Sequence, residues 1–188
     1  MRRSEILVLL VCAATVRAGF AEVQDANAVG FSIRHAVTVA APRSAVYDAF
    51  VNGVGTWWNP DHTVSGNAAA LYLEPRVNGC FCEVLGDGAG LVHLTVTFVN
   101  PGVMLRLTGG LGPLGLMGTA GNMTLEFEDV DGGTGVVLRY AVGGYEPDGL
   151  DTVAPDVDAV LVEQLERLKR FVEQGDPVAR VVGDREGS

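Results

Sequence analysis

The chain is short of basic residues and of cysteine. It has 188 residues with 13 Lys and Arg against 23 Asp and Glu, a formal charge of −10, and three cysteines. An acidic balance of this size repels phosphate backbones, and no run of Lys or Arg offsets it locally. Nucleic acid is therefore excluded as a partner. No apolar run is long enough to span a bilayer.

The longest apolar run lies at the N-terminus and predicts export. Arg2 and Arg3 precede an apolar stretch over 6–16, which is the pattern of a secretory signal peptide. Small residues allow cleavage after Ala18 or after Ala21, and the polar residues that follow favour Ala21. The mature protein is then periplasmic or extracellular.

Export also fixes the expected domain limits. We predict a signal peptide over 1–21, one domain over 22–174 and a loose tail over 175–188. Removing the first 21 residues leaves 10 basic and 22 acidic residues, a formal charge of −12. Val11, directly before Cys12, is larger than a lipoprotein signal accepts, which argues against a lipid anchor at Cys12 and leaves no membrane insertion after cleavage.

Two cysteines remain in the mature chain, as the C-x-C sequence of Cys80 and Cys82. Side chains two apart on a strand are nearly parallel and too distant for a relaxed disulfide. Free, buried thiols are therefore predicted. A zinc site with His35 or His93 as a further ligand is the alternative, but no second ligand motif accompanies the pair, and we expect no metal.

Apolar periodicity predicts an α+β protein. Residues 31–39 alternate as a half-buried strand, and a short amphipathic helix follows Pro42 and ends near Asn52, with another turn over 56–59. A 22-residue amphipathic helix over 153–174 ends the domain. Between them lie six short strands joined by Gly- and Asn-rich turns, which predicts an antiparallel meander: 69–73, 79–85, 91–100, 104–108, 122–129 and 134–142.

Strict alternation also assigns strand faces. In the strand over 91–100 it places Val92, Leu94, Val96 and Phe98 on the buried face and His93 on the exposed one. The same reasoning places a set of glutamates on the solvated face: Glu83, Glu126 and Glu128.

Five segments in this order resemble the START-related helix-grip superfamily (SRPBCC). They are A-P-R-S-A-V-Y-D-A-F-V, T-W-W-N-P-D-H-T, N-G-C-F-C-E, P-G-V-M-L-R-L-T-G-G-L-G-P-L and V-D-A-V-L-V-E-Q-L-E-R-L-K-R. The similarity is to the branch that holds polyketide cyclase/dehydrase-like proteins and homologues of the heat-shock-protein ATPase activator. It implies a curved antiparallel sheet of about seven strands around a long C-terminal helix, with two short helices after the first strand and a cavity for an apolar small molecule.

The candidate site gathers at the expected cavity. Of the adjacent Trp57 and Trp58, one is expected in the core and the other at the rim, because neighbouring helical residues point about 100° apart. His62, in a rigid polar loop, is the favoured polar contact, and His35 lies on an apolar strand face, so both are candidates for catalysis. The predicted ligand-binding residues are Trp57, Trp58, His62, Leu94, Phe98, Leu107, Leu111, Leu114, Met117, Tyr140, Tyr145, Leu161 and Leu165.

No cofactor is expected. The G-x-G-x-x-G match over 110–115 contains Pro113 and precedes a strand instead of a helix, so it lacks the context of a dinucleotide site. The loop instead presents Leu111, Leu114, Leu116 and Met117 on glycines, either as a lid over the cavity, which we favour, or as a subunit contact.

Two functions remain open at this point. The first is an exported protein that binds an apolar small molecule without catalysis. The second is a cyclase- or dehydratase-type enzyme in which His62 or His35 moves protons. A chaperone-activator role is disfavoured because that work is cytosolic, and the sequence leaves the oligomeric state open.

Overall fold

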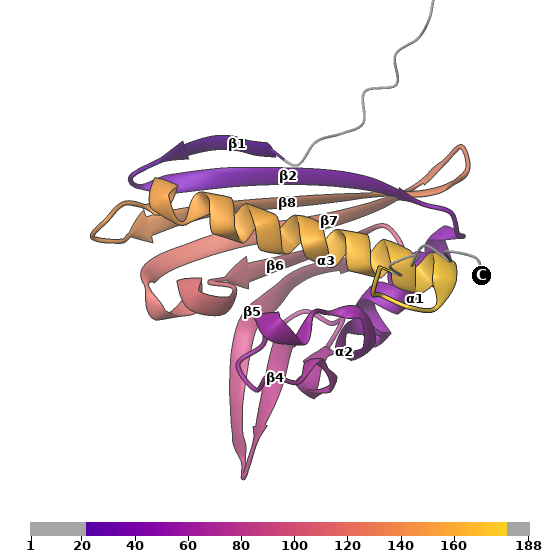
Figure 1. Cartoon of the computed structure of the whole chain (residues 1–188), viewed down its shortest axis with the longest axis horizontal. Helices are drawn as coiled ribbons and strands as arrows, with labels where there is room; N and C mark the ends of the chain where they lie inside the picture. The colour runs from indigo at the N-terminus through magenta and orange to yellow at the C-terminus, as the bar shows by residue number, and fades with distance from the viewer. Residues whose placement is uncertain (1–21, 180–188) are drawn as a thin grey trace, which may run out of the picture.

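The computed structural model describes residues 22–179, and one antiparallel sheet of eight strands dominates it (Figure 1). The strand order is β1-β2-β8-β7-β6-β5-β4-β3, so the meander runs from β3 to β8 and β1 and β2 close the far edge. The strands are β1 (Glu22–Asn27), β2 (Gly30–Val39), β3 (Leu71–Leu73), β4 (Cys80–Gly86), β5 (Ala89–Asn100), β6 (Met104–Gly109), β7 (Gly118–Val130) and β8 (Gly133–Tyr145).

A long helix lies across one face of the sheet, and two short helices pack against it (Figure 1). The α-helices are α1 (Arg43–Asn52), α2 (Val54–Trp57) and α3 (Ala154–Gln174), and short 3-10 turns are η1 (Pro60–His62), η2 (Ala68–Ala70), η3 (Gly112–Leu116) and η4 (Leu150–Thr152). Helix α1 packs near the C-terminal end of α3, and α2 packs nearer its middle. Within the described residues, none of the helices is both long enough and apolar enough to cross a bilayer.

Helix α3 is positioned by its sequence. Gly175 ends it in the left-handed conformation (φ 74°) that favours glycine at this position. Its buried stripe, with Leu161, Leu165 and Leu168, faces the sheet as predicted, because residues three and four apart share a helix face. The α+β helix-grip architecture is thereby confirmed.

The sheet has one strand more than expected. Strand β1 pairs with β2 and reads E-V-Q-D-A-N, a polar stretch without alternation, so periodicity gives no signal for it. The predicted signal peptide lies outside the described residues, as does 180–188 of the predicted tail.

Two β-bulges overturn the predicted faces of β5. His93 has no partner between the pairs Cys82↔Val92 and Phe81↔Leu94, and Thr97 has none between Val96 and Phe98 in the pairing with β6. A bulge adds a residue and reverses the alternation beyond it. Leu94 and Val96 are buried as predicted, but Val92 and Phe98 are exposed and His93 is buried.

The prediction for Glu83 is also wrong. Glu83 is 1% exposed on the strand face that it shares with Phe81, whereas the alternation had placed it in solvent. Its carboxylate is buried because polar partners, described below, satisfy it. Glu128 is exposed and Glu126 half-buried.

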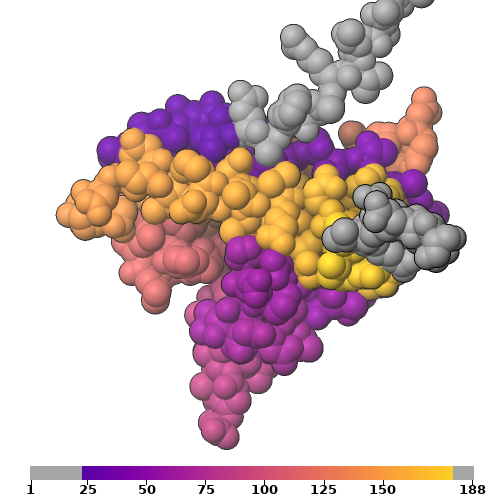
Figure 2. Space-filling model, in the orientation of Figure 1, coloured from indigo at the N-terminus to yellow at the C-terminus, as the bar shows by residue number. Residues whose placement is uncertain are grey.

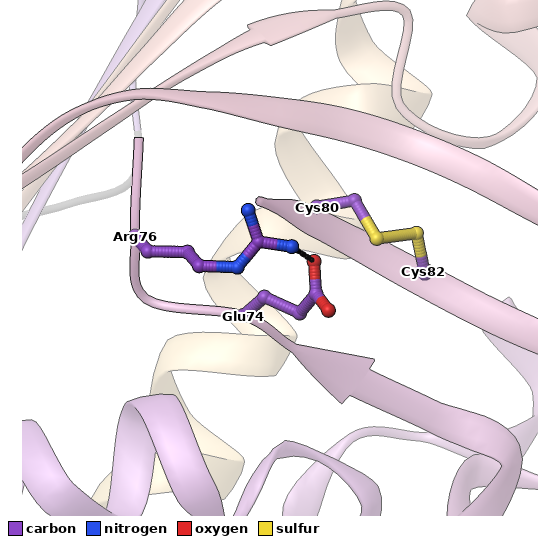
Figure 3. Close-up of a disulfide and its surroundings, with 4 residues drawn as sticks. All are labelled: Glu74, Arg76, Cys80 and Cys82. Carbon is purple, nitrogen blue, oxygen red and sulfur yellow. Dashed lines mark hydrogen bonds and ion pairs between the residues drawn. A yellow bond between two sulfur atoms is a disulfide. The ribbon is translucent and has the colours of Figure 1, made fainter. Parts of the chain in front are cut away.

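Cys80 and Cys82 form a disulfide instead of the predicted free thiols (Figure 3). Their Cα atoms lie 5.4 Å apart, within the range for disulfides and closer than two residues of a regular strand, which are about 6.6 Å apart. A register shift between Phe81 and Cys82 accompanies this local contraction. Because the two sulfur atoms are bonded to each other, neither is a thiolate that could bind zinc, as the alternative prediction for Cys80 and Cys82 required. The Glu74–Arg76 ion pair lies beside it.

Candidate functional site

A small apolar pocket lies between the sheet, α3 and the segment after α1. Its volume is about 30 Å³, room for about one water molecule. Figure 2 shows the segment after α1, in magenta, packed directly against α3, in yellow and orange. The pocket is lined by Phe50, Val54, Trp57, Trp58, Leu73, Phe81, Leu94, Leu107, Leu111, Met123, Leu138, Leu161, Gln164 and Leu165.

Both tryptophans are buried and both line this pocket, so the expectation of one core and one rim residue is wrong. Helix α2 ends at Trp57, and the backbone of Trp58 is extended (φ −61°, ψ 145°). The angle of about 100° between neighbouring helical side chains therefore does not apply to this pair. Their ring centroids lie 5.6 Å apart. Each indole N–H donates to a backbone carbonyl, Trp57 to Ala49 and Trp58 to His62, which allows burial at little polar cost.

Gln164 is the polar residue of the lining, and sequence reasoning missed it. It is 2% exposed. Its Oε1 accepts a hydrogen bond of 2.8 Å from the backbone N–H of Asn59, while its Nε2 has no partner among the described residues. A buried amide group with both donors unused costs free energy, which marks the position as one where a ligand acceptor would be stabilised.

Polar side chains of α3 hold the segment that carries the tryptophans. Glu163 accepts from Asn59 Nδ2 at 2.7 Å and lies 3.0 Å from His62 Nε2. Arg167 donates to the carbonyl of Trp57 at 2.8 Å. This wall of the pocket is therefore tied at its edge by hydrogen bonds, one of them between the side chains of His62 and Glu163.

Glu83 ties the same segment to the sheet. Its carboxylate accepts from the backbone N–H groups of Val64 and Ser65, and it lies 3.0 Å from His93 Nε2. Burial alone would raise the pKa of Glu83, but the hydrogen bonds from Ser65, Val64 and His93 outweigh it and lower the pKa to about 2. Glu83 is thus a buried, ionised anchor beneath residues 64 and 65.

The connection between β6 and β7 is a folded turn fixed by Tyr140. The Tyr140 hydroxyl donates to the carbonyl of Gly109 and accepts from the N–H of Leu111, and burial raises its pKa to about 12 although the second bond lowers it. Of the predicted lid residues, Leu111 lines the pocket, Leu114 is buried in the core without lining the pocket, and Met117 packs partly buried against the core. The hydroxyl of Tyr140 is hydrogen-bonded to two backbone groups, and Tyr140 does not line this pocket.

The remaining predicted residues lie elsewhere. Phe98 is 41% exposed because of the second bulge, and Tyr145 is 71% exposed at the end of β8. His62 lies at the surface against Glu163, and His35 is buried with its Nε2 2.8 Å from Asp158 Oδ1 of α3. Neither histidine lines the pocket, so the structure brings neither candidate for catalysis to it.

The structure adds pocket residues that the sequence reasoning did not select. Most belong to apolar positions that were already predicted as core or strand, so burial was foreseeable but their facing the pocket was not. The sequence pattern did not point to Gln164, because it lies within a helix of mixed polarity. It did not point to His93 either, because His93 lies on a bulge. The added lining residues are Phe50, Val54, Leu73, Phe81, Met123, Leu138 and Gln164.

Comparisons with known proteins bear on the fold. No family model matches the chain, and no curated protein matches its sequence. Solved structures do match. An uncharacterised protein of Rhizobium leguminosarum is 20% identical, with a TM-score of 0.57 over 77% of this chain and 95% of that one. A protein of Chromobacterium violaceum is 19% identical, with a TM-score of 0.54 over 76% and 96%.

A third match is DynU16, from the dynemicin biosynthetic locus. It is 19% identical, with a TM-score of 0.53 over 78% of this chain and 48% of that one. Identities this low show the fold and not the activity. Sheet order, the position of α3 and these matches together confirm the helix-grip fold that the resemblance implied.

Proposed function

We propose that this protein binds an apolar small molecule that carries a hydrogen-bond acceptor, between the sheet and α3. The single observation behind this proposal is the pocket itself, which is lined by apolar side chains except for Gln164, whose Nε2 has no partner among the described residues. Apolar walls with one placed polar group are typical of small-molecule sites.

A ligand of organic size requires the pocket to open, because about 30 Å³ holds only about one water molecule. The wall with Trp57 and Trp58 is the part that moves in this proposal. Its ties to Glu163, Arg167 and Glu83 are hydrogen bonds, which water can replace, whereas the opposite wall is continuous sheet.

The two tryptophans provide the test, since the chain has no others. Phenylnaphthylamine, an apolar fluorescent acceptor of tryptophan emission, should bind and quench both. Leu111→Phe, which narrows the pocket, should weaken binding several-fold. Leu116→Phe is the matched control, because Leu116 lies in the same connection and is 94% exposed. Equal binding by both variants, or no binding by the unchanged protein, would refute the proposal.

Export is part of the proposal. The Cys80–Cys82 disulfide supports it, because disulfides persist mainly in oxidising compartments. The mass of the protein secreted by its host should correspond to a chain that begins at Glu22, or at Gly19 for the other cleavage site. An intact N-terminus on the protein recovered from the cytoplasm would contradict export.

The geometry does not favour the cyclase- or dehydratase-type alternative with His62 or His35 as the base. Each of the two imidazoles lies against a carboxylate of α3, and neither reaches the pocket lining.

A further inference from the structure

Two buried nitrogen atoms beside the pocket have no partner among the described residues: Gln164 Nε2 and His93 Nδ1. The first is used in the proposed function. The second is unexplained by it, although His93 is only 6% exposed. Buried polar atoms are hydrogen-bonded in the great majority of cases, so an unused one in a fixed ring calls for a partner that the chain itself does not supply.

Glu83 fixes which nitrogen of His93 carries the proton. The carboxylate is an acceptor and lies 3.0 Å from Nε2, so Nε2 bears the hydrogen, and in the neutral ring Nδ1 presents its lone pair. The backbone N–H groups of Val64 and Ser65 occupy the other acceptor positions of Glu83. The carboxylate is therefore held in place, and Nδ1 is a preset hydrogen-bond acceptor.

His93 lies one side chain behind the pocket wall. Its ring centroid is 5.3 Å from that of Phe81, and Phe81 is 5.3 Å from Trp58. Phe81 and Trp58 both line the pocket. The bulge at His93 is what turns the imidazole to the same side as Leu94, another lining residue.

We propose that His93 Nδ1 accepts a hydrogen bond from a hydroxyl group of the bound molecule. The inference rests on the proposed function and narrows its ligand class: an apolar molecule with a hydroxyl for His93 and a carbonyl or ether oxygen for Gln164. The hydroxyl reaches Nδ1 when the opening wall carries Trp58 away from Phe81, so that the Phe81 ring on β4 is free to turn aside. Glu83 is a positioning residue that acts through the imidazole.

The test compares two probes that share a naphthalene ring and one oxygen, and in the second a methyl group replaces the hydroxyl hydrogen. Naphthol and its methyl ether compete with phenylnaphthylamine for the pocket, and the ether cannot donate. The unchanged protein should bind naphthol about fivefold more tightly, the difference expected for one net hydrogen bond. His93→Phe should abolish this preference. Val92→Phe, at the exposed neighbouring position of β5, should retain it.

The outcomes separate the two proposals. Equal affinity for naphthol and its ether in the unchanged protein overturns the role of His93 and leaves small-molecule binding intact. If phenylnaphthylamine itself does not bind, both proposals fall together.

A second measurement does not depend on folding of the variant. Side-chain nitrogen NMR of the unchanged protein should show the His93 Nδ1 signal moving on addition of naphthol and not on addition of its ether, while the Nε2 signal stays that of a protonated nitrogen. A His93 signal that naphthol does not move, despite bound naphthol, overturns the proposal.

Discussion

Gln164 and Asn59 join two parts of the chain that are 105 residues apart, through a hydrogen bond of 2.8 Å from the Asn59 backbone N–H to Gln164 Oε1. The bond connects the centre of α3 to the residue directly after Trp58. The same side chain lines the pocket with an unused Nε2. The Gln164 side chain thus holds the wall with Trp57 and Trp58 closed through Oε1, and its Nε2 is a donor available to a ligand in the pocket.

Replacing Gln164 should weaken the closed state. Gln164→Leu leaves the Asn59 N–H without its acceptor, which should lower the free energy of unfolding by about 1 to 3 kcal/mol in urea denaturation. Gln174→Leu is the matched control, since Gln174 lies at the exposed end of the same helix and its loss should change stability by less than about 0.5 kcal/mol. Similar losses in both variants would argue against the bond.

Glu83 should make stability depend on acid. Its pKa falls from 4.5 in the unfolded chain to about 2 in the folded one, so its contribution is complete above pH 4.5 and disappears as the pH falls towards 2. The shift corresponds to about 3 kcal/mol.

The measurement is the free energy of unfolding of the unchanged protein and of Glu83→Gln between pH 7 and pH 2. The difference should be largest at neutral pH and shrink in acid. Glu126→Gln, at the half-buried Glu126–Arg139 pair, is the control and should show little of this effect. Curves that stay parallel for Glu83→Gln would show that the carboxylate is not the anchor described.

Enlarging the pocket should improve binding. Leu165 and Leu168 are both buried on α3, but only Leu165 lines the pocket. Each change to Ala should cost about 2 to 5 kcal/mol of stability. Leu165→Ala should bind phenylnaphthylamine more tightly than the unchanged protein, and Leu168→Ala should not. Equal gains in both would mean that the probe binds wherever a cavity is made.

Removing the disulfide should affect stability only modestly. The bond closes a loop of three residues, and a loop this short gives about 1.5 kcal/mol in the chain-entropy description. Urea denaturation of the Cys80→Ser, Cys82→Ser double variant measures this loss, and chemical reduction of the unchanged protein should reproduce it. Unchanged mass on reduction under denaturing conditions would show that the thiols are free.

Much of the fold could be predicted because it depends on periodicity. The stripe of Leu161, Leu165 and Leu168 repeats at helical spacing over about two turns. The strands of the meander show alternating apolar residues and are separated by turns. The order of these elements was enough to indicate the helix-grip fold. Strand β1 was missed because pairing with β2, and not its own composition, makes it a strand.

The site was predicted less well because it depends on breaks in periodicity. The bulge at His93 reverses the alternation of side chains along β5, so that His93 is buried. Its imidazole there lies 3.0 Å from the carboxylate of Glu83, which is also buried. The end of α2 at Trp57 frees Trp58 to share the pocket. A pattern of period two or 3.6 contains no information about where such a break occurs, so the polar atoms at the pocket could not be found from the chain alone.

Native mass spectrometry of the protein purified from its own host, followed by extraction and identification of the released compound, would show what the pocket binds. We expect one apolar small molecule per chain, with both a hydroxyl and a second oxygen, that is lost on denaturation. A protein that is empty as purified, and that stays empty after incubation with an organic extract of the host, would contradict this expectation.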